Sequence, residues 1–208
     1  MRREATYPDV RSLMKPGDVI AFGGKGQLSD IIKWATRAPV SHVGVIFTTR
    51  ATYDAPDADR YMVNVIESTT LAGAEPGVQV SQLSTRLKAY DGQVWWLPLR
   101  DDVRATRFDE RRFFDFLLAQ KGKGYDYKQA IGSGLDLCDF AGLENTEDFE
   151  RFFCSELVAA ALEEAGVVVG VNASEITPID LCRWPIYADA YTQILGDPRE
   201  IPRYNGLA

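Results

Sequence analysis

The strongest constraint on the fold is a change of pattern along the chain, from strand-like in the first half to helical in the second. Five short stretches rich in apolar and β-branched residues predict strands at residues 18–23, 42–48, 62–67, 78–83 and 93–99. One helical stretch, residues 28–35, lies between the first two strands and is closed by Pro39. This order predicts an α+β fold in which an antiparallel sheet of five to six strands packs on helices. A chain of 208 residues without a linker is expected to form a single domain over residues 1–208.

Start and stop signals mark the helices of the second half. Thr106 and Asp109 resemble a capping box ahead of a helix at residues 113–120, and Thr177 followed by Pro178 predicts another helix start. The clearest helix follows Cys154, because apolar residues recur at helical spacing up to Gly166. That apolar stripe, which we expect to face the core, contains Cys154, Leu157, Val158, Ala161, Leu162 and Ala165.

Cys154 has two possible positions in this helix. No Ser, Thr, Asp or Asn stands at residues 151–153 to cap a helix that begins at Cys154. In that case the free amides of the first turn would favour a thiolate and could bind a developing oxyanion. Alternatively, Asn145, Phe149 and Phe153 could start the helix earlier, which would leave Cys154 in the helix interior and inert.

The chain contains one histidine, His42, at the start of a predicted strand. If the strands at residues 42–48 and 62–67 pair antiparallel with Phe47 opposite Met62, then His42 lies opposite Glu67 on the same face of the sheet. A glutamate there can fix the tautomer of the imidazole and leave its other nitrogen for Cys154. Cysteine, histidine and carboxylate are the components of a thiol nucleophile site.

Each residue also has an ordinary structural interpretation. A cysteine on an apolar helix face is usually a core residue, and a glutamate at a strand end is usually solvated. Cys138 and Cys182 lie in apolar surroundings and are interpreted as structural. Three cysteines without a Cys-x-x-Cys pair argue against a disulfide framework, and a single histidine argues against a zinc site. We therefore expect no metal and no cofactor.

Charge and hydropathy narrow the range of partners. The net charge is −7 and the pI is about 4.8, which does not favour nucleic acid as a partner. No apolar run approaches the roughly 18 residues needed to cross a bilayer, so no transmembrane segment is expected. The N-terminal residues show no signal peptide, so a cytoplasmic location is expected, with secretion by another route left open.

Three groups of residues give the sequence a family resemblance. They are Pro16-Gly17-Asp18-Val19-Ile20 with Leu28-Ser29-Asp30-Ile31-Ile32 and Ser41-His42-Val43-Gly44-Val45; Val65-Ile66-Glu67-Ser68; and Gly124-Tyr125-Asp126-Tyr127 with Phe153-Cys154-Ser155-Glu156-Leu157-Val158. In this order they resemble the circularly permuted papain-like branch of the NlpC superfamily, especially its YiiX-like group. The motifs span about residues 15–165. Histidine before glutamate before cysteine is the permuted order.

The resemblance implies a permuted papain-like fold and a cysteine hydrolase of the amidase or peptidase type. It implies Cys154 as nucleophile, His42 as base and Glu67 as its orienting partner, with Tyr125 and Ser155 as oxyanion or substrate-binding residues. Families with this core act on peptides and other amides or move acyl chains, so the substrate does not follow from the motif. A lipid esterase, thioesterase or acyltransferase with the same triad is one alternative, and a catalytically silent binding module is another.

Overall fold

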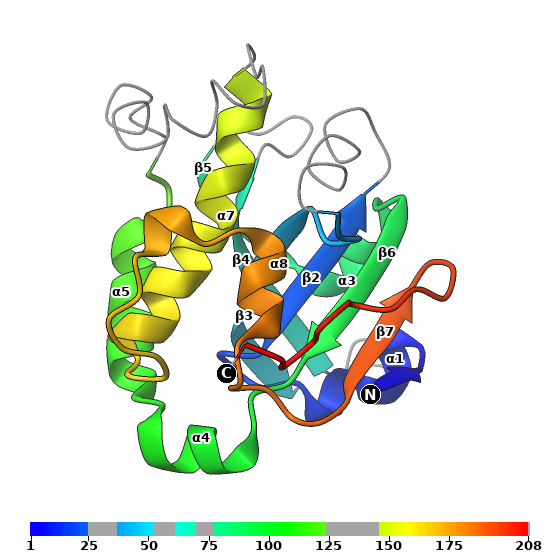
Figure 1. Cartoon of the computed structure of the whole chain (residues 1–208), viewed down its shortest axis with the longest axis horizontal. Coiled ribbons are helices and arrows are strands. Elements are labelled where there is room, and N and C mark those ends of the chain that lie inside the picture. Colours follow the sequence, from blue (N-terminus) through cyan, green and yellow to red (C-terminus); the bar gives the residue numbers. More distant parts are fainter. Residues whose placement is uncertain (25–36, 52–60, 70–76, 124–145, 208) are drawn as a thin grey trace.

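The computed structural model describes residues 1–24, 37–51, 61–69, 77–123 and 146–207, and only the backbone of residues 146–153. Within these ranges a seven-stranded sheet is covered by helices on both faces (Figure 1). The strands are β1 (Arg2–Glu4), β2 (Val19–Gly24), β3 (His42–Ala51), β4 (Tyr61–Thr69), β5 (Gly77–Gln82), β6 (Gly92–Leu97) and β7 (Tyr191–Leu195). The α-helices are α1 (Tyr7–Val10), α3 (Leu83–Lys88), α4 (Asp101–Arg107), α5 (Glu110–Gln120), α7 (Thr146–Glu164) and α8 (Pro178–Arg183), and the 3₁₀ helices are η1 (Arg11–Leu13) and η2 (Ala173–Glu175). The predicted α+β class is confirmed.

The sheet differs from the prediction in its two outer strands. The strand order is β1-β7-β6-β2-β3-β4-β5, in which β2 to β6 correspond to the five predicted strands. The prediction of an antiparallel sheet of five to six strands is wrong, because β1 and β7 are added and pair with each other in parallel. β1 consists of Arg2, Arg3 and Glu4, which show no apolar alternation, and its partner comes from the other end of the chain.

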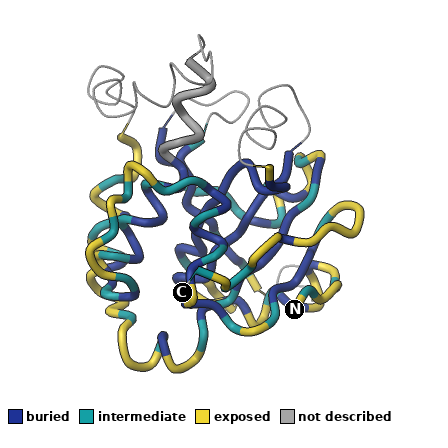
Figure 2. Tube along the Cα trace, viewed as in Figure 1, coloured by how far each residue is buried: buried dark blue, intermediate teal, exposed yellow. Residues whose placement is uncertain are grey.

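Two hydrophobic cores lie on the two faces of the sheet. One core joins the sheet to α5, α7 and α8, and the other joins it to α1 and α3. Successive residues of β2 and β3 alternate between the two, as the period of a strand requires. Figure 2 shows that the central strands and the part of α7 that faces them are buried, whereas α4 and α5 expose much of their surface.

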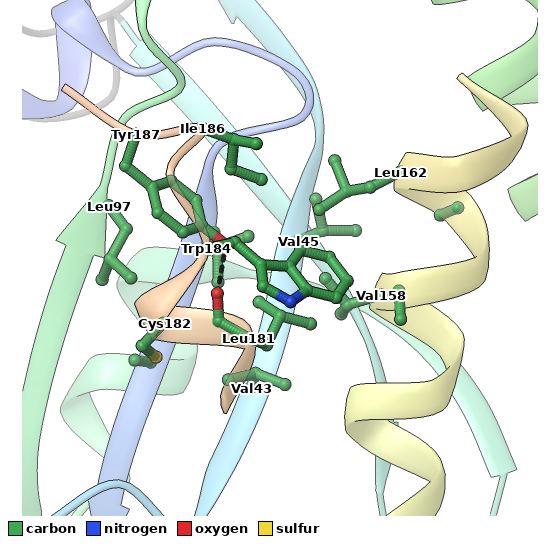
Figure 3. Packing of buried hydrophobic residues seen from close by; sticks show 14 of the residues in the cluster. Val43, Val45, Leu97, Val158, Leu162, Leu181, Cys182, Trp184, Ile186 and Tyr187 are labelled. Carbon is green, nitrogen blue, oxygen red and sulfur yellow. Dashed lines mark hydrogen bonds between the residues drawn. The ribbon is translucent and has the colours of Figure 1, made fainter. Parts of the chain in front are cut away.

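Near the C-terminal end of the chain, α8 and the segment after it pack against the sheet and α7 (Figure 3). The Thr177 side chain caps α8 by accepting a hydrogen bond from the backbone amide of Asp180, which confirms the predicted start. The hydroxyl of Tyr187 donates a hydrogen bond of 3.1 Å to the carbonyl oxygen of Leu181. These hydrogen bonds lie within α8 and its flanking residues, and apolar packing places α8 beside α7.

Two predicted helix starts are wrong, and a third prediction lies outside the described residues. Asp109 caps α5 by itself, accepting a hydrogen bond from the amide of Arg112, whereas Thr106 belongs to α4 and its hydroxyl donates to the carbonyl oxygen of Asp102. Likewise α7 begins at Thr146, so a start at Cys154 is wrong and the alternative of an earlier start is the one observed. The helix predicted at residues 28–35 falls in a range that the structure does not describe.

A buried carboxylate connects the start of β2 with β6 and α4. Asp18 is 1% exposed, and burial raises its pKa, although Arg104 and other donors oppose the shift. Its oxygens accept hydrogen bonds from Trp96 Nε1 at 2.9 Å and from the Leu99 amide at 3.0 Å, and they also bind the Arg104 guanidinium. Arg104 in turn lies over the ring of Phe108, 5.3 Å from its centroid.

Candidate active site

His42 is the first residue of β3 and is 7% exposed. It pairs with Phe22 of β2, and the centroids of the two rings are 5.4 Å apart. Val43 and Val45 of β3 pack in the core under α7, and His42, at the end of the strand, contacts both Glu67 and Cys154. The only imidazole of the chain is thus held between the end of the sheet and its neighbouring elements.

The predicted pairing of Phe47 with Met62 is wrong, because the register of β3 on β4 is shifted by a few residues. Val45 pairs with Ile66, and a bulge after Ile46 moves the register, so that Met62 pairs with Arg50. Continued toward the start of β3, the pairing of Val45 with Ile66 sets Gly44, not His42, opposite Glu67. A shift of two residues keeps each side chain on its face of the sheet, so His42 and Glu67 become diagonal neighbours.

The diagonal contact is short and buried. His42 Nε2 donates a hydrogen bond of 2.6 Å to Glu67 Oε2, and the Glu67 side chain has no exposed surface. Gly44 makes this approach possible: a Cβ atom there would lie 2.8 Å from Cγ2 of Val65 and 3.2 Å from Cβ of Glu67. The structure thus brings together the predicted histidine and carboxylate.

A third charged residue joins this pair and was missed in the sequence. Arg86 of α3 donates a hydrogen bond of 2.9 Å from Nε to Glu67 Oε1, and its Nη2 lies 3.5 Å from Oε2. Its guanidinium lies 5.0 Å from the ring centroids of both Phe22 and Tyr90. The sequence offered no signal for Arg86, because residues 78–83 were predicted as a strand and the short helix after them was not expected.

Cys154 lies inside α7, eight residues after its first residue, Thr146. The prediction of a nucleophile at a helix start is therefore wrong: amides beyond the first turn bond to carbonyls within the helix and cannot bind the sulfur or an oxyanion. Cys154 is fully buried in the core between α7 and the sheet. Even so, it interacts with His42 both by a hydrogen bond and by charge.

These contacts set the charges of the site. Burial alone would lower the pKa of His42, but the charge and hydrogen bond of Cys154, followed by those of Glu67, raise it to about 9. Burial alone would raise the pKa of Glu67, but His42 and Arg86 lower it to about 2. Near pH 7 the imidazole is therefore protonated and the carboxylate ionised. With Nε2 bound to Glu67, Nδ1 is the nitrogen left for the thiol.

The remaining predicted residues stand apart from this group. The Ser155 hydroxyl is buried and donates to the carbonyl oxygen of Ile176, a contact that attaches α7 to the segment after η2. Its predicted oxyanion or substrate role stays a prediction that this contact does not support. Tyr125 and Cys138 lie outside the described residues. Cys182 is buried in α8, and burial raises the pKa of its thiol well above the usual range.

Two further observations concern metals and membranes. Across the described ranges, no group of three or more His, Cys, Asp or Glu side chains is arranged to hold a metal ion. No helix in the part of the chain that the structure describes is long and apolar enough to span a membrane.

Comparisons with known proteins include a distant likeness among solved structures. No protein-family model matches the sequence, and no curated protein matches it. Among solved structures, the chain is similar to the metalloprotein yiiX from Escherichia coli O157:H7, with a TM-score of 0.45 and 18% sequence identity. The match covers 73% of this chain and 66% of that chain, just under two thirds of the neighbour's length. The neighbour bears the name of the group that the sequence motifs resemble, and the papain-like assignment stays a prediction.

Proposed function

We propose that this protein is a cysteine hydrolase of the amidase or peptidase type. Cys154 is the nucleophile, His42 the acid and base, and Glu67 the residue that orients His42. The observation that carries the proposal is the position of His42, whose Nε2 donates to Glu67 at 2.6 Å while its imidazole also bonds to Cys154. The order His42, Glu67, Cys154 along the chain is the order of a permuted papain-like enzyme.

The reaction follows from these contacts. In the reacting site His42 already carries the proton as an imidazolium, and the sulfur of Cys154 reacts as the thiolate beside it. The sulfur attacks the carbonyl carbon of the amide, and the C=O electrons move onto oxygen. When this intermediate collapses, the C–N bond breaks and His42 gives its proton to the leaving amine. Water then loses a proton to His42 and attacks the thioester. The C–S bond breaks, which releases the acid and restores the thiolate beside the imidazolium.

The most direct test needs no substrate. Iodoacetamide alkylates thiolates, and Cys154 and Cys182 are both fully buried, so access alone predicts equal rates. We expect Cys154 to be labelled at least about tenfold faster near pH 7, because it alone of the two bonds to His42. Peptide mapping by mass spectrometry after short exposures gives both rates. Equal rates, or no effect of His42→Ala on Cys154, would remove the basis for the proposal.

Turnover assays then separate the chemistries. A panel of peptide amides and acyl esters is tested with the wild type, Cys154→Ala, His42→Ala and Glu67→Gln. We expect each alanine variant to lose at least about 10⁴-fold in kcat, and Glu67→Gln to lose less because the base remains. Preference for esters over amides would support the acyl-lipid alternative. Full activity in a folded His42→Ala variant would exclude the assigned base, because the chain has no other histidine.

A further inference from the structure

Arg86 contacts the carboxylate of Glu67 on the side away from His42. Its Nε donates to Oε1 at 2.9 Å, while Oε2 accepts from His42 at 2.6 Å. The Arg86 side chain is 13% exposed and that of Glu67 is not exposed at all. A buried carboxylate is stable as an ion only when its oxygens are well bonded, and here each oxygen has a close nitrogen donor.

Two aromatic rings hold the guanidinium in place. Phe22 and Tyr90 each have their ring centroid 5.0 Å from the Arg86 guanidinium carbon, and the two rings meet edge to face at 5.1 Å. Phe22 also contacts the imidazole of His42, with ring centroids 5.4 Å apart. Phe22 therefore contacts both Arg86 and His42, and a planar guanidinium suits both the rings and the carboxylate.

We propose that Arg86 is a positioning residue of the active site: it fixes the orientation of the Glu67 carboxylate, so that Nε2–H of His42 stays bonded to Glu67 and Nδ1 stays directed at Cys154. This inference rests on the proposed function for its catalytic meaning. Among the described residues, the charged and titratable groups around His42 are Cys154 from α7 and Glu67 from β4, with Arg86 from α3 acting through Glu67.

The experiment uses the single histidine. Because His42 is the only one, the imidazole signals in an NMR spectrum of histidine-labelled protein belong to this residue. We expect the wild type to show an Nε2-bound proton protected from exchange with water. In Arg86→Met that proton should exchange rapidly, and iodoacetamide labelling of Cys154 should slow by about 10–100-fold, the range for losing a group that orients a histidine through its partner. Arg86→Lys should fall between the two, because a lysine keeps the charge but not the planar fork.

Arg104 provides a matched control. It too pairs with a buried carboxylate, that of Asp18, and lies over an aromatic ring, with its side chain 17% exposed. Arg104→Met should lower the melting temperature as Arg86→Met does, and it should leave the His42 proton and the labelling of Cys154 unchanged. If Arg86 had only a structural role, Arg86→Met and Arg104→Met would give the same His42 proton exchange and the same Cys154 labelling.

Two outcomes would overturn the inference. One is a folded Arg86→Met variant whose His42 proton and Cys154 labelling match the wild type. If Arg86→Met does not fold, an Arg86→Lys variant that matches the wild type in both measurements overturns it instead. The proposed function fails separately, since turnover assays test it and the NMR measurement does not. A wild type without turnover on any substrate would refute the proposed function. Loss of the protected His42 proton in Arg86→Met would still support the positioning role of Arg86.

Discussion

Replacing Gly44 with alanine is expected to destabilise the protein by about 1–2 kcal/mol and to disturb the contact between His42 and Glu67. The φ angle of Gly44 lies outside the left-handed region, so alanine is allowed there and by itself would stabilise the chain by about 0.4–1 kcal/mol. The new Cβ, however, lies 2.8 Å from Val65 Cγ2 and 3.2 Å from the Ile66 carbonyl oxygen. Overpacking of this kind costs about 1–3 kcal/mol, which exceeds the gain.

Urea unfolding and thermal melting measure the effect, with an expected fall in melting temperature of about 2–8 °C. A double-mutant cycle with Val65→Ala identifies its cause, because that change removes the nearest atom. The loss in Gly44→Ala/Val65→Ala should be smaller than the sum of the two single losses, by about 1 kcal/mol. An unchanged or higher stability of Gly44→Ala, or strictly additive losses, would refute the argument that Gly44 makes room for Glu67.

Two further predictions concern stability. The pKa of His42 is raised on folding to about 9, so its stabilising contribution is complete below its unfolded pKa near 6.5 and is lost as the pH rises through 9. Urea titrations should find a loss on the order of 3 kcal/mol in the wild type and none in His42→Gln. A wild type with no such alkaline loss would contradict the assigned contacts. The Ser68 hydroxyl is buried with no hydrogen-bond partner among the described residues, so Ser68→Ala should be neutral or stabilise by about 1 kcal/mol. Ser41→Ala is the control, because its hydroxyl donates to the Phe22 carbonyl oxygen at 3.4 Å and its loss should destabilise. A clear loss of stability in Ser68→Ala would contradict this prediction and would mean that the Ser68 hydroxyl makes a stabilising hydrogen bond.

The central strands were predictable because their pattern is local. Apolar and β-branched residues marked β2 to β6 within a few residues of their ends. β1 was not predictable in the same way, because Arg2, Arg3 and Glu4 carry no apolar pattern and their strand exists only through pairing with β7, nearly 190 residues away. Such a pairing depends on tertiary contacts that bring the two segments together, and the local sequence of either segment does not predict it.

The contact between His42 and Glu67 was predictable from the sequence, whereas its register was not. The exact register of β3 on β4 depends on a bulge after Ile46, and no feature of the sequence predicts this bulge. The predicted contact between His42 and Glu67 is present although the predicted register was wrong, because a shift of two residues keeps a side chain on the same face of the sheet. Arg86 could not be found by spacing, since it reaches Glu67 from a different element, 19 residues further along the chain.

In the proposed mechanism, the position of Cys154 inside α7 changes which groups can stabilise a thiolate. At a helix start, free amides would have favoured the thiolate, but inside the helix those amides are bonded to carbonyls one turn earlier. The charge needed beside the sulfur must then be supplied by His42, which burial alone would keep neutral. Cys154, followed by Glu67, keeps His42 protonated there, and Glu67 in turn is bonded on its other side to Arg86. Each charge in this series has an opposite charge beside it, so removing any one member leaves a buried charge without its partner, and such losses should not be additive.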